Sequence, residues 1–137
     1  MRAAISSSST NRIKKYKMTA KNYQTFTVRQ EKDFTIISII EKRIYMQLAE
    51  KFKEEVSDFL ANGSKKIIID LSEVSVMNSA ALGVLIALQN EMENKKGKLN
   101  IVGLQPLMEE IFSRMRLELL FQIEPSIDTA IGKHTER

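Results

Sequence analysis

The sequence predicts an α/β fold: a single domain with a mixed, mostly parallel sheet of about four to five strands. The sheet opens with a β-hairpin, and about four helices pack against it. Segments of strand character alternate with segments of helical periodicity, and the first two strand-like segments are separated only by a short polar turn. Strands that alternate with helices mostly pair in parallel, whereas consecutive strands joined by a turn pair antiparallel. A chain of 137 residues is enough for one such domain and not for two.

The first half of the chain contains the hairpin and one helix. Residues 23–30 alternate between apolar and polar, which is typical of a half-buried strand, and residues 34–40 are nearly all β-branched or aromatic, which indicates a buried strand. The polar residues 30–33 form the turn. A helix is predicted within residues 43–63, where apolar residues recur every three or four positions before an Asn-Gly stop signal: Tyr45, Leu48, Phe52, Val56 and Phe59.

The second half alternates strictly between strands and helices. Ile67–Ile69 is a buried strand that ends at residues 70–72, and Ala80–Asn94 is a helix with a very apolar first half. Leu99–Leu104 is the next strand. A helix is predicted from Pro106 to residue 120. Proline can stand at its start because proline is tolerated in the first turn of a helix. A short strand at Phe121–Ile123 and a final helical turn ending at Ile131 complete the fold. The inward face of the 80–94 helix is predicted at Leu82, Leu85, Ile86, Gln89 and Met92.

Charge is distributed unevenly between the N-terminal segment and the rest of the chain. The formal net charge is +4, but residues 1–21 hold six basic residues and no acid, so the remainder carries a net charge of −2. We therefore expect a basic, serine-rich, disordered tail at 1–21, a domain at 22–132 and a C-terminal tail at 133–137. A basic tail does not indicate direct nucleic-acid binding by the folded part. The six residues are Arg2, Arg12, Lys14, Lys15, Lys17 and Lys21.

The residues needed for common enzyme sites are missing. The chain has no cysteine, its single histidine, His134, lies near the C-terminus, and no glycine-rich phosphate-binding loop occurs. We expect no catalytic residues, no metal site and no cofactor. The protein is therefore expected to bind a partner and not to act as an enzyme. No segment is long and apolar enough for a membrane span or a signal-peptide core, so a cytoplasmic location is expected.

The segment MNSAALGVLIAL, residues 77–88, carries the candidate site. Asn78 and Ser79 precede an apolar helix, and either residue is a good N-cap. That role alone explains both residues. The same position suits a phosphoserine, because the positive end of the helix dipole stabilises the added charge. Asp70 follows a buried strand, and its expected role is to accept hydrogen bonds from loop amides.

The run from Ile67 to Leu85 resembles the signature of STAS domains, the anti-sigma factor antagonist family. The usual form is a strand, then D-L-S-x-V, then M-D-S-[SA]-G-[LI]-G-x-L, and this chain has DLSEV and MNSAALGVL. The resemblance extends over about residues 23–131. It implies a switch protein that binds an anti-sigma factor, which is also a serine kinase, and that a serine phosphatase resets. The phosphoacceptor would be Ser79, and the partner-binding loop would comprise Asp70, Ser72, Met77, Asn78, Ser79, Ala80, Ala81, Leu82 and Gly83.

The sequence departs from the family pattern at three places. Asn78 replaces the motif aspartate, Ala81 replaces a glycine and so stiffens the loop, and residues 40–44 replace a common acidic turn. A second hypothesis is therefore a STAS binding module that is not phosphorylated, in a signalling complex or as a transporter ATPase accessory subunit. A third is an enzyme or nucleotide-binding protein, which only the region of Asp70 favours. The oligomeric state is expected to be a monomer or a weak dimer.

Overall fold

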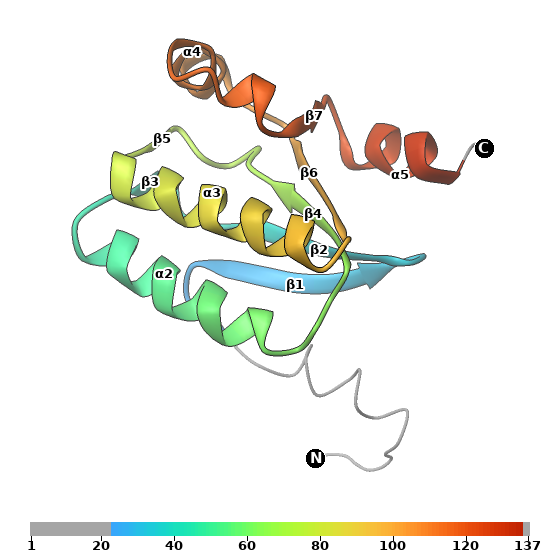
Figure 1. Ribbon diagram of the computed structural model, residues 1–137. Helices are drawn as coiled ribbons and strands as arrows, with labels where there is room; N and C mark the ends of the chain where they lie inside the picture. The colour runs from blue at the N-terminus through green and yellow to red at the C-terminus, as the bar shows by residue number, and fades with distance from the viewer. Residues whose placement is uncertain (1–22, 136–137) are drawn as a thin grey trace.

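The computed structural model describes residues 23–135, and Figure 1 shows their arrangement. The predicted tail at 1–21 lies outside the described residues. The elements, in chain order, are β1 (Phe26–Glu31), β2 (Phe34–Ile39), β3 (Arg43–Ile44), α2 (Gln47–Leu60), β4 (Lys66–Asp70), β5 (Val76–Met77), α3 (Ser79–Asn94), β6 (Lys98–Val102), α4 (Pro106–Arg114), the short 3-10 helix η1 (Leu117–Leu119), β7 (Gln122–Glu124) and α5 (Ile127–Thr135).

The main sheet has five strands in the order β1-β2-β4-β6-β7. The hairpin strands β1 and β2 pair antiparallel, with Phe26 opposite Ile39, and the remaining neighbours pair in parallel. Within residues 23–135 four α-helices accompany this sheet. The predicted α/β fold, with its opening hairpin and mixed sheet, is therefore confirmed.

Helices cover both faces of the sheet, and each face has its own apolar core. The larger core joins one face of the strands to α2, α3 and α4, and the smaller one lies between the other face and α5. Side chains alternate between the two, as the twofold period of a strand requires. In β4, Ile67 and Ile69 enter the larger core while Ile68 enters the smaller one. This burial on both faces explains the continuous isoleucine run in the sequence.

The start of the described chain is fastened to α2. The Phe26 ring lies 6.3 Å, centroid to centroid, from the rings of both Phe52 and Phe59, in edge-to-face contact. The buried Glu55 carboxylate accepts hydrogen bonds from the backbone N–H groups of Gln24 (2.8 Å) and Thr25 (2.9 Å), and from the Thr25 hydroxyl (2.7 Å). These contacts hold α2 against the sheet at a defined position.

The segment before α2 differs from the prediction. Arg43 and Ile44 are not helical: they form β3, which pairs in parallel with Val76 and Met77 of β5 as a separate two-stranded sheet. Helix α2 begins only at Gln47, and the Tyr45 side chain, predicted on the buried face, is 43% exposed. Backbone pairing with a distant segment has overridden a local spacing that also fits a helix.

The segment after Pro106 also differs. The predicted helix to residue 120 ends at Arg114, because Arg116 adopts a left-handed backbone conformation with φ of 59°. The chain then forms η1, and the Leu120 carbonyl directly after it accepts a hydrogen bond from Gln89 Nε2 of α3 at 3.2 Å. The last strand is β7, and α5 extends to Thr135, beyond the turn predicted to end at Ile131.

Candidate functional site

The small β3–β5 sheet positions the loop that leads into α3. The N–H of Ser75 donates to the Lys42 carbonyl at 2.7 Å, and the N–H of Asn78 donates to the Ile44 carbonyl at 3.0 Å. Between them, the Met77 side chain is buried in the larger core. The loop is thus fixed by backbone pairing on one side and by an apolar anchor on the other, so the start of α3 has a defined place.

Asn78 and Ser79 divide the two roles that the sequence left open. Asn78 is the N-cap of α3: its side-chain oxygen Oδ1 accepts the N–H of Ala81 at 2.9 Å. Ser79 is the first residue of the helix, and its side chain is exposed. Within residues 23–135 its hydroxyl makes no hydrogen bond. The capping role therefore belongs to Asn78, and the Ser79 hydroxyl faces solvent at the positive end of the helix.

The neighbouring residues of the predicted loop are split between the surface and the core. Ala80 and Gly83 are exposed, whereas Ala81 and Leu82 are buried in the larger core. Ala81 lies in the first turn of α3 and not in the loop, so the residue does not stiffen a loop here. Ser79, Ala80 and Gly83 are therefore accessible at the surface, whereas Met77, Ala81 and Leu82 anchor this segment in the core.

Asp70 and Ser72 form a separate, locally bonded turn. Asp70 Oδ1 accepts the N–H of Ser72 at 3.0 Å, which confirms the expected bond to a loop amide. The Ser72 carbonyl accepts Gln105 Nε2 at 2.8 Å. Gly103 passes close by with φ of 75°, and a Cβ there would lie 3.1 Å from Asp70 Oδ1. Asp70 thus closes the turn that follows β4, and Gln105 ties this turn to the start of α4.

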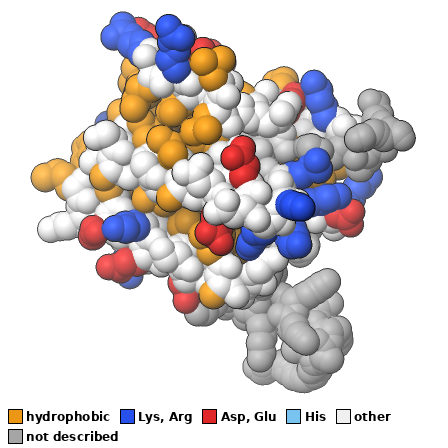
Figure 2. Space-filling view, viewed as in Figure 1, with side chains coloured by type: hydrophobic (Ala, Val, Ile, Leu, Met, Phe, Trp, Pro, Cys, Tyr) orange, Lys and Arg blue, Asp and Glu red, His pale blue; other side chains and the backbone are white. Residues whose placement is uncertain are grey.

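An apolar groove lies between α2 and α3 and begins beside the candidate phosphoacceptor. Its volume is about 570 Å³. On α2 it is lined by Ala49, Glu50, Lys53, Val56, Ser57 and Leu60, and on α3 by Ala80, Gly83, Val84, Ala87, Leu88 and Glu91, with Met46 and Asn78 at one end. Figure 2 shows hydrophobic side chains at the surface between the two helices. The groove and Ser79 therefore belong to one continuous surface.

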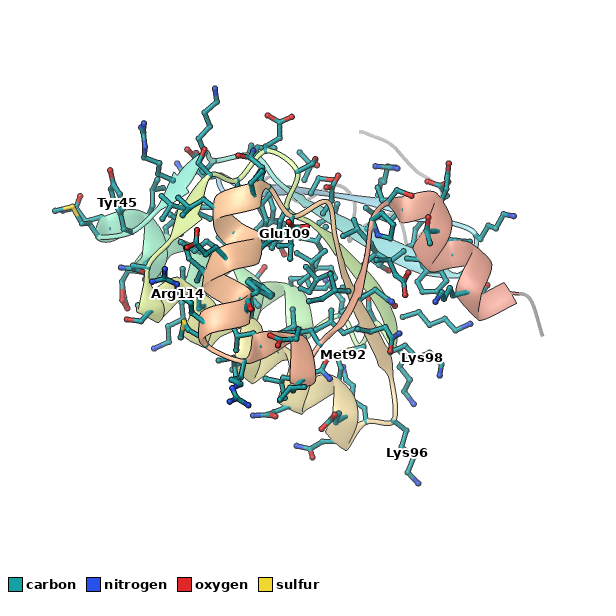
Figure 3. All side chains as sticks on the ribbon, turned by 90° about the horizontal axis from the view of Figure 1, so that it is seen from above. Tyr45, Met92, Lys96, Lys98, Glu109 and Arg114 are labelled. Atoms are coloured by element: carbon teal, nitrogen blue, oxygen red, sulfur yellow. The ribbon has the colours of Figure 1, made fainter. Side chains whose placement is uncertain are left out.

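Met46 stands at the mouth of this groove, and the sequence analysis did not single it out. Its side chain is 78% exposed, and its backbone has φ of 56°, a conformation that is uncommon for a residue with a side chain. Tyr45, labelled in Figure 3, lies next to it at the edge of the molecule. The spacing in the sequence assigns only its neighbour Tyr45 to the apolar face of a helix and gives no signal for Met46.

The described residues offer no cluster for a metal ion: within residues 23–135, no group of three or more histidine, aspartate or glutamate side chains is placed to bind one. None of the helices in this part of the chain is long and apolar enough to span a membrane.

Comparison with known proteins identifies the family. The family model for the STAS domain matches residues 25–130. The chain belongs to the STAS domain family. The predicted resemblance is therefore confirmed, and the matched region contains the whole of the signature run, residues 67–85.

Three relatives show what this STAS domain is similar to. A Thermotoga maritima protein provisionally named an anti-sigma factor antagonist is 28% identical over 100 residues, which cover 72% of this chain and 88% of that protein. A crystal structure of a T. maritima protein with the same provisional name has a TM-score of 0.71 at 24% identity and covers 79% and 92% of the two chains. The Bacillus cell fate determinant SpoIIAA in its phosphorylated form has a TM-score of 0.59 at 18% identity, covering 79% and 97%.

Proposed function

We propose that this STAS domain is an anti-sigma factor antagonist that binds an anti-sigma factor through the start of α3 and the α2–α3 groove. The partner is also a serine kinase, phosphorylation of Ser79 releases it, and a serine phosphatase restores the unmodified protein. The names of the sequence relatives support the general role. The observation that carries the proposal is the position of Ser79: exposed, first in α3 and adjacent to an apolar groove.

The geometry of Ser79 suits phosphoryl transfer by a partner that supplies ATP and Mg²⁺. The Ser79 oxygen would attack the γ-phosphorus of ATP, the bond to the ADP oxygen would break, and the hydroxyl proton would leave with a base of the kinase. An exposed hydroxyl with no hydrogen bond inside the described domain needs no local unfolding for this attack. This STAS domain contributes only the acceptor oxygen and its placement.

A phosphate at Ser79 would be compatible with the fold and incompatible with a dry interface. It adds a charge of about −1.5 to −2 at the positive end of α3, where the helix dipole favours an anion. In a complex, the same charge would lie beside the apolar walls of the groove, at Ala80 and Gly83. Burying a charge without a partner costs several kcal/mol, on the order of a thousandfold or more in affinity.

A second candidate function is a STAS binding module that is not phosphorylated. The observation in its favour is Asn78, which stands where the family motif has aspartate. The amide caps α3 but carries no charge, so it cannot act as a base for the Ser79 proton. If phosphorylation depends on that carboxylate, the groove would still bind a partner, but the complex would not be switched.

The two functions are separated by comparing four full-length baits in the source organism: wild type, Ser79→Ala, Ser79→Asp and Ser113→Asp. Ser113 is exposed on α4, so Ser113→Asp adds the same charge away from the groove. The phosphorylated antagonist predicts phosphate on Ser79 by mass spectrometry, and a kinase-like anti-sigma factor that co-purifies with every bait except Ser79→Asp. If that partner stays bound to Ser79→Asp and Ser79 carries no phosphate, the unswitched module is correct.

A further inference from the structure

The end of the molecule opposite Ser79 carries a lysine-rich surface made by three loops. It comprises Lys32 from the β1–β2 turn, Lys65 and Lys66 at the start of β4, and Lys95, Lys96 and Lys98 between the end of α3 and the first residue of β6. Within residues 32–33, 61–66 and 95–98 the only carboxylate is Asp33. Figure 2 shows Lys and Arg side chains gathered on the right of that view, beyond the end of α3. We call this surface the lysine face.

The three loops form one continuous surface because they contact one another directly. The N–H of Lys98 donates to the Lys65 carbonyl at 2.8 Å, and Lys95 Nζ donates to the Ser64 carbonyl at 3.4 Å. Lys66 Nζ pairs with Asp33 at 3.4 Å and lies 5.5 Å from the centre of the Phe34 ring. The lysine face therefore has a fixed arrangement, although its outer side chains extend freely into solvent.

The most exposed members are free to meet a ligand. Lys32, Lys65, Lys96 and Lys98 are exposed, and Figure 3 shows Lys96 and Lys98 extending outward beside the end of α3. Lysines after α2 and α3 also complement the negative ends of the two helix dipoles. That local effect explains single lysines near each helix end, but it does not account for Lys32, which follows a strand. Glu93 and Glu118 line a surface hollow together with Lys98, so six positive charges stand against three negative ones in this region. The excess of positive charge creates an electrostatic surface for an anionic partner.

We propose that the lysine face binds the surface of membranes that contain anionic phospholipids. Its three loops contain no arginine, whose guanidinium group binds phosphates and bases through two parallel hydrogen bonds. They also contain no exposed aromatic ring on which nucleic-acid bases could stack. Lysines are compact, strongly hydrated charges on flexible stems, which suit a fluid layer of headgroups. Each lysine near such a surface strengthens binding about fivefold, until added salt screens the attraction.

The orientation of the lysine face leaves the candidate partner site accessible. Ser79 begins α3 and Lys95 directly follows its last residue, so the 16-residue helix separates them by about 24 Å. A protein resting on its lysine face would present the start of α3 away from the membrane. The inference does not depend on the proposed function, because the two surfaces share no residue.

The test is co-sedimentation of the full-length protein with sucrose-loaded vesicles. One set contains phosphatidylcholine alone, and the other contains phosphatidylcholine and phosphatidylglycerol at about 7:3, each at low and high NaCl. The patch variant is Lys65→Gln/Lys96→Gln/Lys98→Gln. The charge-matched control is Lys42→Gln/Arg114→Gln/Arg116→Gln, three exposed cations outside the lysine face. A third variant, Lys14→Gln/Lys15→Gln/Lys17→Gln, measures the contribution of the basic N-terminal segment.

The proposal predicts that wild type binds only the anionic vesicles and is released at high salt. The patch variant should lose at least tenfold in partition coefficient, while the control variant should change less than threefold. Equal losses in the patch and control variants, or a loss only in the N-terminal variant, would overturn it. So would tighter binding of wild type to a 20-base-pair DNA duplex than to the anionic vesicles, which would assign the lysine face to nucleic acid. Ser79→Asp should sediment like wild type, so this result is separable from the proposed switch.

Discussion

Asn78 caps the helix on which Ser79 stands, and the bond that does so is the 2.9 Å contact from the Ala81 N–H to Asn78 Oδ1. Because Asn78 already accepts one of the unpaired N–H groups of the first turn, the Ser79 hydroxyl is not needed to cap the helix. Two adjacent polar residues that looked interchangeable in the sequence therefore have different roles. Asn78 stabilises α3, and Ser79 presents an oxygen to solvent.

The cap can be tested by substitutions at Asn78. Asn78→Ala should lower the free energy of unfolding by about 1 kcal/mol, because the Ala81 N–H loses its acceptor. Asn78→Asp keeps the acceptor and adds a charge that the helix dipole favours, so it should equal or exceed wild type by about 0.3–1 kcal/mol. Urea unfolding measures both values. A matching loss for Asn78→Asp would show that the amide nitrogen, and not the oxygen, is the important group.

Gly83 offers a way to fill the groove without disturbing the fold. A Cβ at Gly83 would meet no atom within 4 Å, so Gly83→Ala should stabilise α3 by about 1 kcal/mol, the usual cost of glycine inside a helix. Gly83→Gln also introduces a good helix former. Because Gly83 lines the groove, the glutamine side chain would extend into the space that a partner would occupy. Under the proposed function, Gly83→Gln should weaken partner binding at least tenfold while unfolding at the same or higher urea concentration than wild type.

Titration calorimetry with the purified partner would measure that loss, and Gly83→Ala serves as the matched control. If Gly83→Gln binds as tightly as Gly83→Ala, the partner does not enter the groove. The proposed interface would then be limited to the loop around Ser79.

The elements predicted well are those whose signals are local and strong. The isoleucine runs of β2 and β4 and the apolar helix α3 were expected within a few residues of their observed positions, because burial on both faces of a sheet demands continuous apolar residues. The sequence also predicts a helix cap at Asn78 or Ser79, but it does not say which of the two residues caps α3. The STAS signature lies in the same part of the chain, so the family was recognisable from it.

The features that were missed depend on contacts between distant segments. The strands β3 and β5 have two residues each, and only their pairing defines them, so no periodicity in residues 43–46 could show a strand. The groove beside Met46 exists only because α2 and α3 lie next to each other on the sheet. The left-handed backbone conformation just after α4 occurs at Arg116 and not at a glycine, so the sequence gives no signal for it. Each of these features is set by tertiary structure rather than by local propensity.

Gly97 should respond in the opposite way to Gly83. A Cβ at Gly97 would lie 2.6 Å from the Lys65 carbonyl oxygen and 2.6 Å from Met92 Cε, distances too short for non-bonded atoms. The methionine can move, but the carbonyl belongs to backbone that also accepts the Lys98 N–H. Gly97→Ala should therefore lower the free energy of unfolding by about 1–3 kcal/mol. Paired urea melts of Gly97→Ala and Gly83→Ala test the two local geometries, and equal effects would contradict both.

Glu55 links stability to pH through the bonds that fasten residues 24–25 to α2. Burial alone would raise the pKa of this carboxyl, but the hydrogen bonds from Gln24 and Thr25 outweigh it and hold the pKa below its ordinary value of 4.5. Because the folded-state pKa is the lower one, the unfolded state binds the proton more readily. The contribution is therefore fully present above about pH 4.5 and is lost as the pH falls through the folded-state pKa.

Replacing the carboxylate should remove that pH dependence. Glu55→Gln retains one acceptor oxygen for the N–H of Gln24 and the two donors of Thr25, so we expect it to lose about 1–3 kcal/mol at neutral pH. As the pH is lowered from 6 to 3, the difference from wild type should shrink, because wild type also loses its charge. Glu54→Gln, one residue away and exposed, is the matched control and should stay within about 0.5 kcal/mol of wild type. A difference between Glu55→Gln and wild type that is constant across this pH range would show that packing, and not the charge of Glu55, holds this end of the chain.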